Sequence, residues 1–251
     1  MSGHSKWSTI KRKKGAADAK RGAIFTRLAR EIAVAAREGG GDPDANFRLR
    51  LAVDKARAEN MPKDNIERAI RRGTGEDKDG AAYEEIMYEG YGPKGVAMMI
   101  ETVTDNRNRS VSEIRHALSR SGGSMAEVGA VSWQFERMAY FAIPSSELDY
   151  DRAFELAIEA GADDVAEDED MIEITGPVDT FKAIADLLHQ AKVNPEEAEL
   201  RMVPKQELEL DVNETLQVMK VIESLEEMDD VQSVYSNLKM SEEALAALEA
   251  E

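Results

Sequence analysis

Apolar residues recur at helical spacing through the first 75 positions of the chain. Within residues 16–38 they form a single stripe, which predicts one long helix ending at three consecutive glycines. The members of this stripe are Ile24, Phe25, Leu28, Ala29, Ile32 and Ala36. Two shorter patterns predict helices over 42–59, with Asp42 as the N-terminal cap, and over 62–72, with Gly73 as the stop. Three helices with short connections predict a small bundle.

After a polar linker the period of the apolar positions changes from that of helices to that of strands. Residues 83–91 and 96–104 predict a β-hairpin, because a Gly-Pro-Lys-Gly turn separates them. A helix is expected over 107–121, followed by a strand over 128–135. This segment therefore predicts the beginning of a sheet that carries a helix.

Residues 137–204 predict the order strand, helix, strand, strand, helix, strand, which is the ferredoxin-like order. Residues 207–236 add a strand at 207–212, a helix and one more strand. Three elements are too few for a domain, so we infer that they complete the sheet begun at residue 83. Residues 137–204 are then an insertion.

These patterns predict an α+β protein, with an N-terminal three-helix domain followed by two ferredoxin-like α/β domains, the third inserted into the second. The basic helical domain is expected at 1–75 and begins with a mobile arm that has too few apolar residues for a core. The second domain is discontinuous, at 81–136 plus 205–240, and the inserted domain covers 137–204.

Charge is distributed unevenly along the 251 residues, whose net charge is −18. Residues 1–75 hold 18 Lys+Arg and 9 Asp+Glu, a net of +9, whereas residues 76–251 hold 14 and 41, a net of −27. Such an asymmetry indicates a basic binding module attached to an acidic body. The alternative is an acidic surface that serves solubility alone.

The absence of cysteine fits a reducing compartment, and no apolar run approaches the roughly 20 residues that span a bilayer. We therefore expect a cytoplasmic protein without a membrane partner.

Positive side chains that could contact phosphates gather in the arm and on one face of the first helix. They are Lys6, Lys11, Arg12, Lys13, Lys14, Lys20, Arg21, Arg27, Arg30 and Arg37. Trp7 either contacts nucleic acid, by stacking on a base or inserting in a groove, or packs back against the bundle. A second candidate is the start of the helix after residue 105, where Arg107 and Arg109 either bind an anion beside the helix N-terminus or are solvated next to a capped turn.

Few residues suggest catalysis. The three histidines, His4, His116 and His189, have no metal-ligand spacing, and no nucleophile elbow or phosphate-binding loop is present. We expect a protein that is not an enzyme and has no metal or cofactor. The enzymatic alternative is an unusual site between the two α/β domains.

Four long stretches resemble the YebC family, and the resemblance extends over nearly the whole chain. The stretches are GHSKWSTIKRKKGAADAKRGAIFTRLAREI (3–32), GGGDPDANFRLRLAVDKARAENMPKDNIERAIRRGTGE (39–76), YEEIMYEGYGPKGVAMMIETVTDNRNR (83–109) and VSWQFER (131–137). The family includes bacterial proteins described as probable transcriptional regulators and a mitochondrial translational activator of cytochrome oxidase. The resemblance implies three domains and a non-enzymatic, cytoplasmic protein.

Two functions are implied by the resemblance. The first is DNA-binding transcriptional regulation, and the second is a ribosome-associated translation factor that contacts ribosomal or transfer RNA and relieves stalling. We expect nucleic acid as the partner of the basic end, with DNA as the first hypothesis. The acidic domains could also receive a protein partner.

Overall fold

The computed structural model describes residues 18–77, 83–168 and 170–250. Internal contacts divide this part of the chain into two compact units. The larger unit comprises residues up to Trp133 and those from Glu207 onward, and the smaller unit comprises Gln134–Gln206. The smaller unit therefore interrupts the larger one in sequence.

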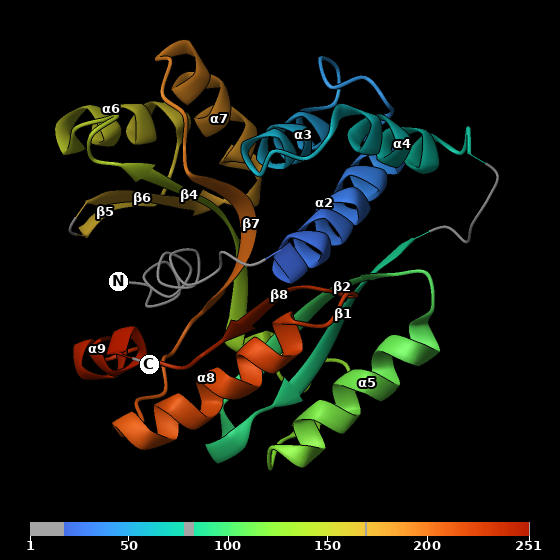
Figure 1. The fold of residues 1–251 in the computed structure, drawn as a ribbon. Coiled ribbons are helices and arrows are strands. Elements are labelled where there is room, and N and C mark those ends of the chain that lie inside the picture. The colour runs from blue at the N-terminus through green and yellow to red at the C-terminus, as the bar shows by residue number, and fades with distance from the viewer. Residues whose placement is uncertain (1–17, 78–82, 169, 251) are drawn as a thin grey trace. The chain divides into compact units, whose positions relative to one another are not determined.

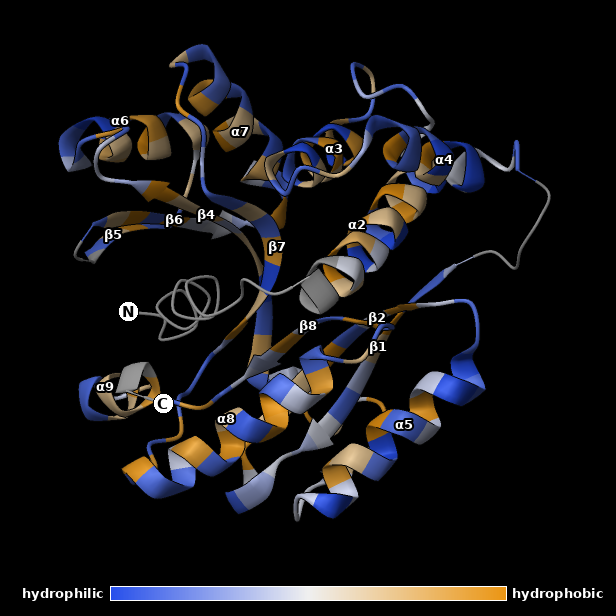
Figure 2. Ribbon diagram, viewed as in Figure 1, coloured by the Kyte–Doolittle hydropathy of each residue, from blue (hydrophilic) through white to orange (hydrophobic). Residues whose placement is uncertain are grey.

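Three helices begin the larger unit: α2 (Asp18–Gly39), α3 (Phe47–Ala58) and α4 (Lys63–Thr74) (Figure 1). Each carries both hydrophobic and hydrophilic residues (Figure 2), so that each has a face to bury. The buried side chains of the bundle are Leu28, Ile32, Ala35, Ala36, Leu49, Ala52, Val53, Ala56, Met61, Ile66 and Ala69. Alanines make up a large share of this core, which lets the helices approach closely.

The start of α3 differs from the prediction. The helix begins at Phe47 and its N-cap is the buried Asn46, whose side-chain oxygen accepts a hydrogen bond from the backbone N–H of Leu49 at 3.1 Å. The amide nitrogen of Asn46 also donates to the carbonyl oxygen of Ala35 at 2.7 Å. Asp42 lies in the preceding turn, so the prediction that it caps the helix is wrong. Asn46 is the better cap because it also satisfies a carbonyl of α2.

The end of α4 differs as well. The helix continues through Gly73 and ends at Gly75, which adopts the left-handed conformation with φ of 77°. A Cβ atom on Gly73 would lie 2.2 Å from the carbonyl oxygen of Ala33 on α2. Gly73 is therefore a contact residue between two helices, and the prediction that it stops the helix is wrong.

The first sheet lies in the larger unit and has the strand order β3-β1-β2-β8. Its strands are β3 (Ser124–Met125), β1 (Glu84–Tyr91), β2 (Ala97–Thr104) and β8 (Val231–Ser236), and every neighbouring pair is antiparallel. The predicted strands at 128–135 and 207–212 are wrong. The first segment is a loop leading into a short 3-10 turn, and the second makes only an isolated bridge between Leu208 and Leu238.

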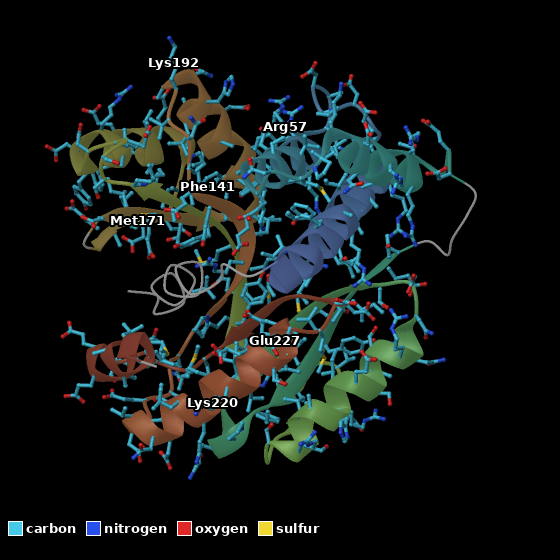
Figure 3. All side chains as sticks on the ribbon, in the orientation of Figure 1. Arg57, Phe141, Met171, Lys192, Lys220 and Glu227 are labelled. Carbon is cyan, nitrogen blue, oxygen red and sulfur yellow. The ribbon has the colours of Figure 1, made fainter. Side chains whose placement is uncertain are left out.

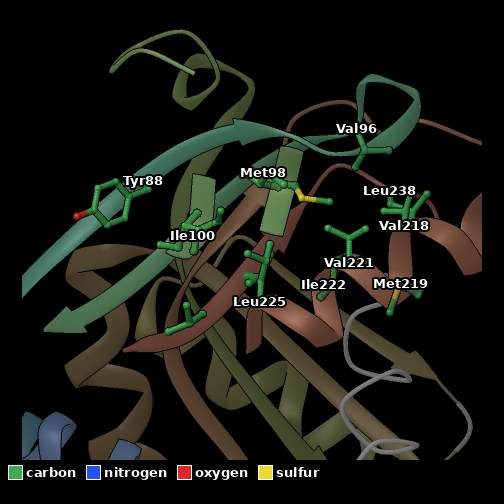
Figure 4. Close-up of a cluster of buried hydrophobic side chains, with 14 of the residues drawn as sticks. Tyr88, Val96, Met98, Ile100, Val218, Met219, Val221, Ile222, Leu225 and Leu238 are labelled. Atoms are coloured by element: carbon green, nitrogen blue, oxygen red, sulfur yellow. The ribbon is translucent and has the colours of Figure 1, made fainter. Parts of the chain in front are cut away.

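Helices α5 (Arg107–Arg120) and α8 (Val212–Glu226) lie side by side on one face of this sheet (Figure 1). Figure 4 shows part of this core, where Met98 and Ile100 of β2 lie in one cluster with Val218, Ile222 and Leu225 of α8. Helix α9 (Glu242–Ala250) follows at the end of the chain and also packs on this core. The segment after the smaller unit therefore completes the sheet begun before it.

The second sheet forms the smaller unit and has the order β5-β6-β4-β7. Its strands are β4 (Phe135–Pro144), β5 (Asp164–Asp168), β6 (Met171–Pro177) and β7 (Glu197–Pro204). Helices α6 (Tyr150–Ala160) and α7 (Phe181–Gln190) lie on one side of it (Figure 1), giving the ferredoxin-like order. The first sheet also has four strands and two helices, but its elements follow the order β-β-α-β-α-β. The predicted α+β class is confirmed.

In the described part of the chain no helix has both the length and the apolar character that a membrane span requires.

Candidate nucleic-acid interface

The positive charge of the N-terminal part is concentrated at its beginning. Residues 1–17 hold 5 Lys+Arg and no Asp or Glu, a net of +5, whereas residues 18–75 hold 13 Lys+Arg and 9 Asp+Glu, a net of +4. Residues 1–17 lie outside the described residues, with the proposed mobile arm and its candidates Lys6, Trp7, Lys11, Arg12, Lys13 and Lys14. The side chains of Lys20 and Arg21 lie outside them too. The described bundle supplies the remaining candidates.

Arg30 does not face outward from α2. Its side chain is only 9% exposed, and its Nη1 atom lies 2.8 Å from Oδ1 of Asp230, in the loop before β8. The same nitrogen donates to the backbone oxygen of Asp229. The expectation that Arg30 lies on an outer face is therefore wrong, because helical periodicity cannot show that a second element covers that side of the helix.

Asp230 is the centre of a buried polar cluster that joins α2 to the sheet. Its Oδ2 atom lies 2.7 Å from the hydroxyl of Ser110, 3.0 Å from that of Thr104 and 2.8 Å from Nη2 of Arg109. Burial alone would raise the pKa of this carboxyl, but the hydrogen bonds from Ser110, Arg109 and Thr104 and the charge of Arg30 outweigh burial and lower the pKa. The carboxylate therefore stays charged. We call Arg30, Thr104, Arg109, Ser110 and Asp230 the Asp230 cluster.

Three more arginines of the bundle contact residues that lie next to this sheet in the chain or on a helix that covers it. Arg27 donates to the backbone oxygen of Glu226 at 3.3 Å, and Arg37 donates to the backbone oxygen of Tyr83. The guanidinium of Arg72 lies 3.9 Å from the centre of the Tyr83 ring, a cation–π contact. Arg27 thus contacts the end of α8, Arg30 the loop before β8 and Arg37 the residue before β1, so these guanidiniums are at least partly occupied by internal bonds.

Other cations of the bundle are exposed, among them Arg57 at the end of α3 (Figure 3) and Lys63, Arg68 and Arg71 of α4. Arg57 is paired with Asp54 at 3.0 Å and Lys63 with Glu67 at 3.5 Å. Within the described residues, Arg68 and Arg71 have no recorded ion-pair partner. None of these side chains is among the candidates predicted from the sequence. For Arg68 and Arg71, the helical spacing relative to the buried Ile66 and Ala69 is the signal that identifies them.

The start of α5 has the character of a capped turn. The side chain of Asn106, rather than that of Thr104 or Asp105, accepts the backbone N–H of Arg109 at 3.1 Å. The Arg109 guanidinium is paired with Asp105 at 3.1 Å as well as with Asp230. Arg107 is exposed, so of the two predicted anion-binding side chains it is the more available one.

The loop that replaces the predicted strand at 128–135 presents two exposed apolar residues, Val128 at 95% and Trp133 at 68%. The buried carboxylate of Glu89 holds this loop, accepting the backbone N–H groups of Gly129 at 2.7 Å, Val131 at 2.6 Å and Ser132 at 2.8 Å. Burial would raise the pKa of Glu89, but these three hydrogen bonds lower it. Trp133 is an exposed aromatic ring in a supported position, of the kind on which a base can stack.

Candidate metal ligands do not converge in the described residues: no group of three or more His, Asp or Glu side chains there could hold an ion.

Two family descriptions match this chain. "TACO1/YebC protein N-terminal domain" matches residues 5–76, and "TACO1/YebC second and third domain" matches residues 83–238. A probable transcriptional regulatory protein of Geotalea uraniireducens is 53% identical over 245 residues, with 98% of each chain covered. A protein of the same description from Chlorobaculum tepidum is 51% identical, with 100% of each chain covered.

The fold has a counterpart among crystal structures as well. A conserved hypothetical protein of Aquifex aeolicus superimposes with a TM-score of 0.82 and is 41% identical, with 90% of this chain and 93% of that chain covered.

Proposed function

Because this chain belongs to the TACO1/YebC family, as the resemblance implied, we propose that it is a cytoplasmic, non-enzymatic regulator of gene expression that binds nucleic acid through its basic N-terminal part. Relatives described as probable transcriptional regulatory proteins support regulation of transcription, with DNA as the first target. We also propose the three-domain division at 1–75, at 81–136 plus 205–240, and at 137–204.

The observation that carries the proposal is the separation of charge along the chain. The net charge of residues 1–75 is +9 and that of residues 76–251 is −27. A polyanion is attracted to residues 1–75 and repelled by residues 76–251, so we expect it to bind the first segment only. Lys and Arg side chains that neutralise phosphates release counterions, which makes such binding strong at low salt.

The internal contacts of the bundle indicate which cations contribute most. Residues 1–17, with Lys6 and the basic run 11–14, contain no acidic residue, and Arg68 and Arg71 are exposed on α4. In contrast, Arg30 is largely occupied by the Asp230 cluster. We therefore assign the main phosphate contacts to the arm and α4, and weaker ones to Arg27, Arg37, Arg107 and Arg109.

The test is fluorescence anisotropy of the full chain with a labelled DNA duplex and with a structured RNA of equal length, over a series of salt concentrations. We expect affinity to fall with salt by a log–log slope of about 0.9 for each duplex phosphate contacted. Replacing Lys6, Lys11, Arg12, Lys13 and Lys14 with Gln should lower that slope and weaken binding strongly. The control K182Q/K192Q removes positive charge from the acidic part and should leave both unchanged.

The two nucleic acids separate the candidate functions. Tighter binding to the duplex supports a transcriptional role. Tighter binding to RNA, together with sedimentation of the chain with ribosomes, supports the translational alternative, in which shape and stacking dominate recognition. If the arm variant binds both as tightly as the wild type, the proposed interface is wrong.

A further inference from the structure

Helix α6 of the smaller unit exposes a row of large apolar side chains. Tyr150 is 36% exposed, Phe154 46% and Ile158 63%. Their spacing of four residues places them on one side of the helix, where each lies one turn from the next. The rings of Tyr150 and Phe154 are near-parallel, with centres 6.2 Å apart. We call these three residues the α6 stripe.

The stripe is not needed to hold α6 on its own sheet. A different side of the helix, with Ala153, Leu156 and Ala157, is buried and makes that attachment. The hydroxyl of Tyr150 donates to the backbone oxygen of Val165 at 3.4 Å, so the stripe begins beside the edge strand β5. Apolar side chains that contribute little to the core and form a continuous row are typical of an interaction surface.

An acidic row borders the stripe. Asp151, Glu155 and Glu159 each follow a stripe residue by one position, which places the row about 100° further around the helix. All three are exposed, and among the described residues only Glu155 has a recorded ion pair, with Arg152 at 2.7 Å. The unit around them is also acidic: residues 134–206 hold 6 Lys+Arg and 18 Asp+Glu, a net of −12.

We propose that the α6 stripe and its acidic row bind a basic amphipathic helix of a partner protein. The apolar side chains of that helix, spaced by three and four residues, pack on Phe154 and Ile158, and its Lys or Arg side chains face the carboxylates. Nucleic acid does not fit this surface, because its phosphates would meet the carboxylates. A second copy of the chain fits poorly, because pairing two stripes brings two acidic rows together.

The experiment uses two synthetic peptides as probes for the full chain. Both are about 16 residues long, enough for four helical turns, and carry the same leucine pattern. One has lysines beside the leucines and the other has glutamates. By fluorescence anisotropy the lysine peptide should bind, more tightly at low salt, and the glutamate peptide at least tenfold more weakly.

Variants connect the binding to the stripe. F154S and I158S should each weaken the lysine peptide about tenfold, and D151N/E155Q/E159Q should remove most of the salt dependence. The control V128S changes an exposed apolar side chain of the other unit and should change nothing. Urea unfolding of I158S, which alters the more exposed side chain, should stay close to the wild type, and F154S should remain folded with a modest loss of stability, so a loss of binding by I158S reports the surface.

Four results would overturn the proposal. They are equal binding of the two peptides, binding that F154S and I158S leave intact, no binding of the lysine peptide up to about 1 mM, and dimerisation in sedimentation equilibrium that I158S abolishes. The last result would assign the stripe to a second copy. None of them bears on the basic arm, so this proposal and the proposed function can fail independently.

Discussion

Replacing Asp230 with Asn removes the charge around which the helical bundle is joined to the first sheet. Asp230 has a side chain that is 3% exposed, and it is paired with Arg30 at 2.8 Å and with Arg109 at 2.8 Å. The variant D230N keeps the shape of the side chain. It leaves the buried guanidinium of Arg30 without a counter-charge and turns an acceptor into a donor that faces other donors.

The magnitude follows mainly from Arg30. Removing one partner of a buried ion pair costs about 3–5 kcal/mol, because the remaining charge is left uncompensated. The Arg109 side chain is 41% exposed, so its pairing adds at most about 1 kcal/mol. Asn retains one acceptor oxygen and recovers part of the loss. We therefore expect D230N to lower the free energy of unfolding by about 3 kcal/mol.

The assay is urea unfolding followed by far-UV circular dichroism. With a slope near 2 kcal/mol per molar, the expected loss moves the midpoint down by about 1.5 M. The matched control is D229N, the same chemical change on the adjacent exposed residue, which should stay within about 0.5 kcal/mol of the wild type. A double-mutant cycle with R30M should show a coupling of about 2 kcal/mol. If D230N resembles D229N, or if the coupling is zero, the assigned role of Asp230 is wrong.

Three further predictions concern the larger unit. E89Q should lower the free energy of unfolding by about 2 kcal/mol and speed proteolysis after Val128, because at least one of three backbone N–H groups loses its acceptor. G73A should lower the melting temperature by an amount equivalent to about 1–3 kcal/mol, since the new Cβ meets the Ala33 oxygen, whereas G22A, with nothing within 4 Å, should raise it slightly. The lowered pKa of Asp230 means that its contribution is present above the ordinary aspartate pKa of about 3.9 and is lost as the pH falls through the folded-state value. Urea midpoints of wild type and D230N should therefore differ by a constant amount from pH 7 to about pH 5 and converge below about pH 4.

Much of the fold could be predicted because local patterns and the tertiary structure agree in most elements. The apolar period of the first helix and the hairpin around Gly92 follow from side-chain spacing and turn chemistry alone. The errors occur where one local signal competes with a long-range one. Asp42 and Asn46 are both acceptable caps, and only the carbonyl of Ala35 on another helix favours Asn46. A glycine near the end of a helical pattern predicts a helix stop. At Gly73 the glycine is instead required by the close approach of Ala33, a tertiary contact that the local pattern does not contain.

The candidate interface was harder to predict, because the sequence does not show whether a positive side chain is paired inside the protein or is free to contact a phosphate. Arg30 and Arg37 have the spacing of an outer face, yet Arg30 bonds to the loop before β8 and Arg37 to the residue before β1. Asp230 lies 200 positions after Arg30, and no local rule connects them. The loop that carries Trp133 is held by the carboxylate of Glu89, about 40 residues earlier in the chain. A local sequence pattern therefore could not predict its position either. Residues 1–17 hold +5 of the net charge of +9 in residues 1–75, and their contact with phosphates stays a prediction.

The inward arginines also change how the basic end works. If all cations of the bundle faced solvent, nucleic acid could bind a bundle that moves freely relative to the acidic sheet. Bonds from Arg27, Arg30 and Arg37 instead join α2 to the end of α8, to the loop before β8 and to the residue before β1, so the bundle can move relative to the first sheet only if these bonds break. Neutralising Arg30 therefore acts mainly on stability, whereas neutralising Lys11 or Lys13 acts on the salt-dependent attraction of phosphates. Two measurements distinguish these effects. Neutralising Arg30 lowers the free energy of unfolding whether or not a polyanion is present, whereas neutralising Lys11 or Lys13 lowers the log–log slope of affinity against salt concentration.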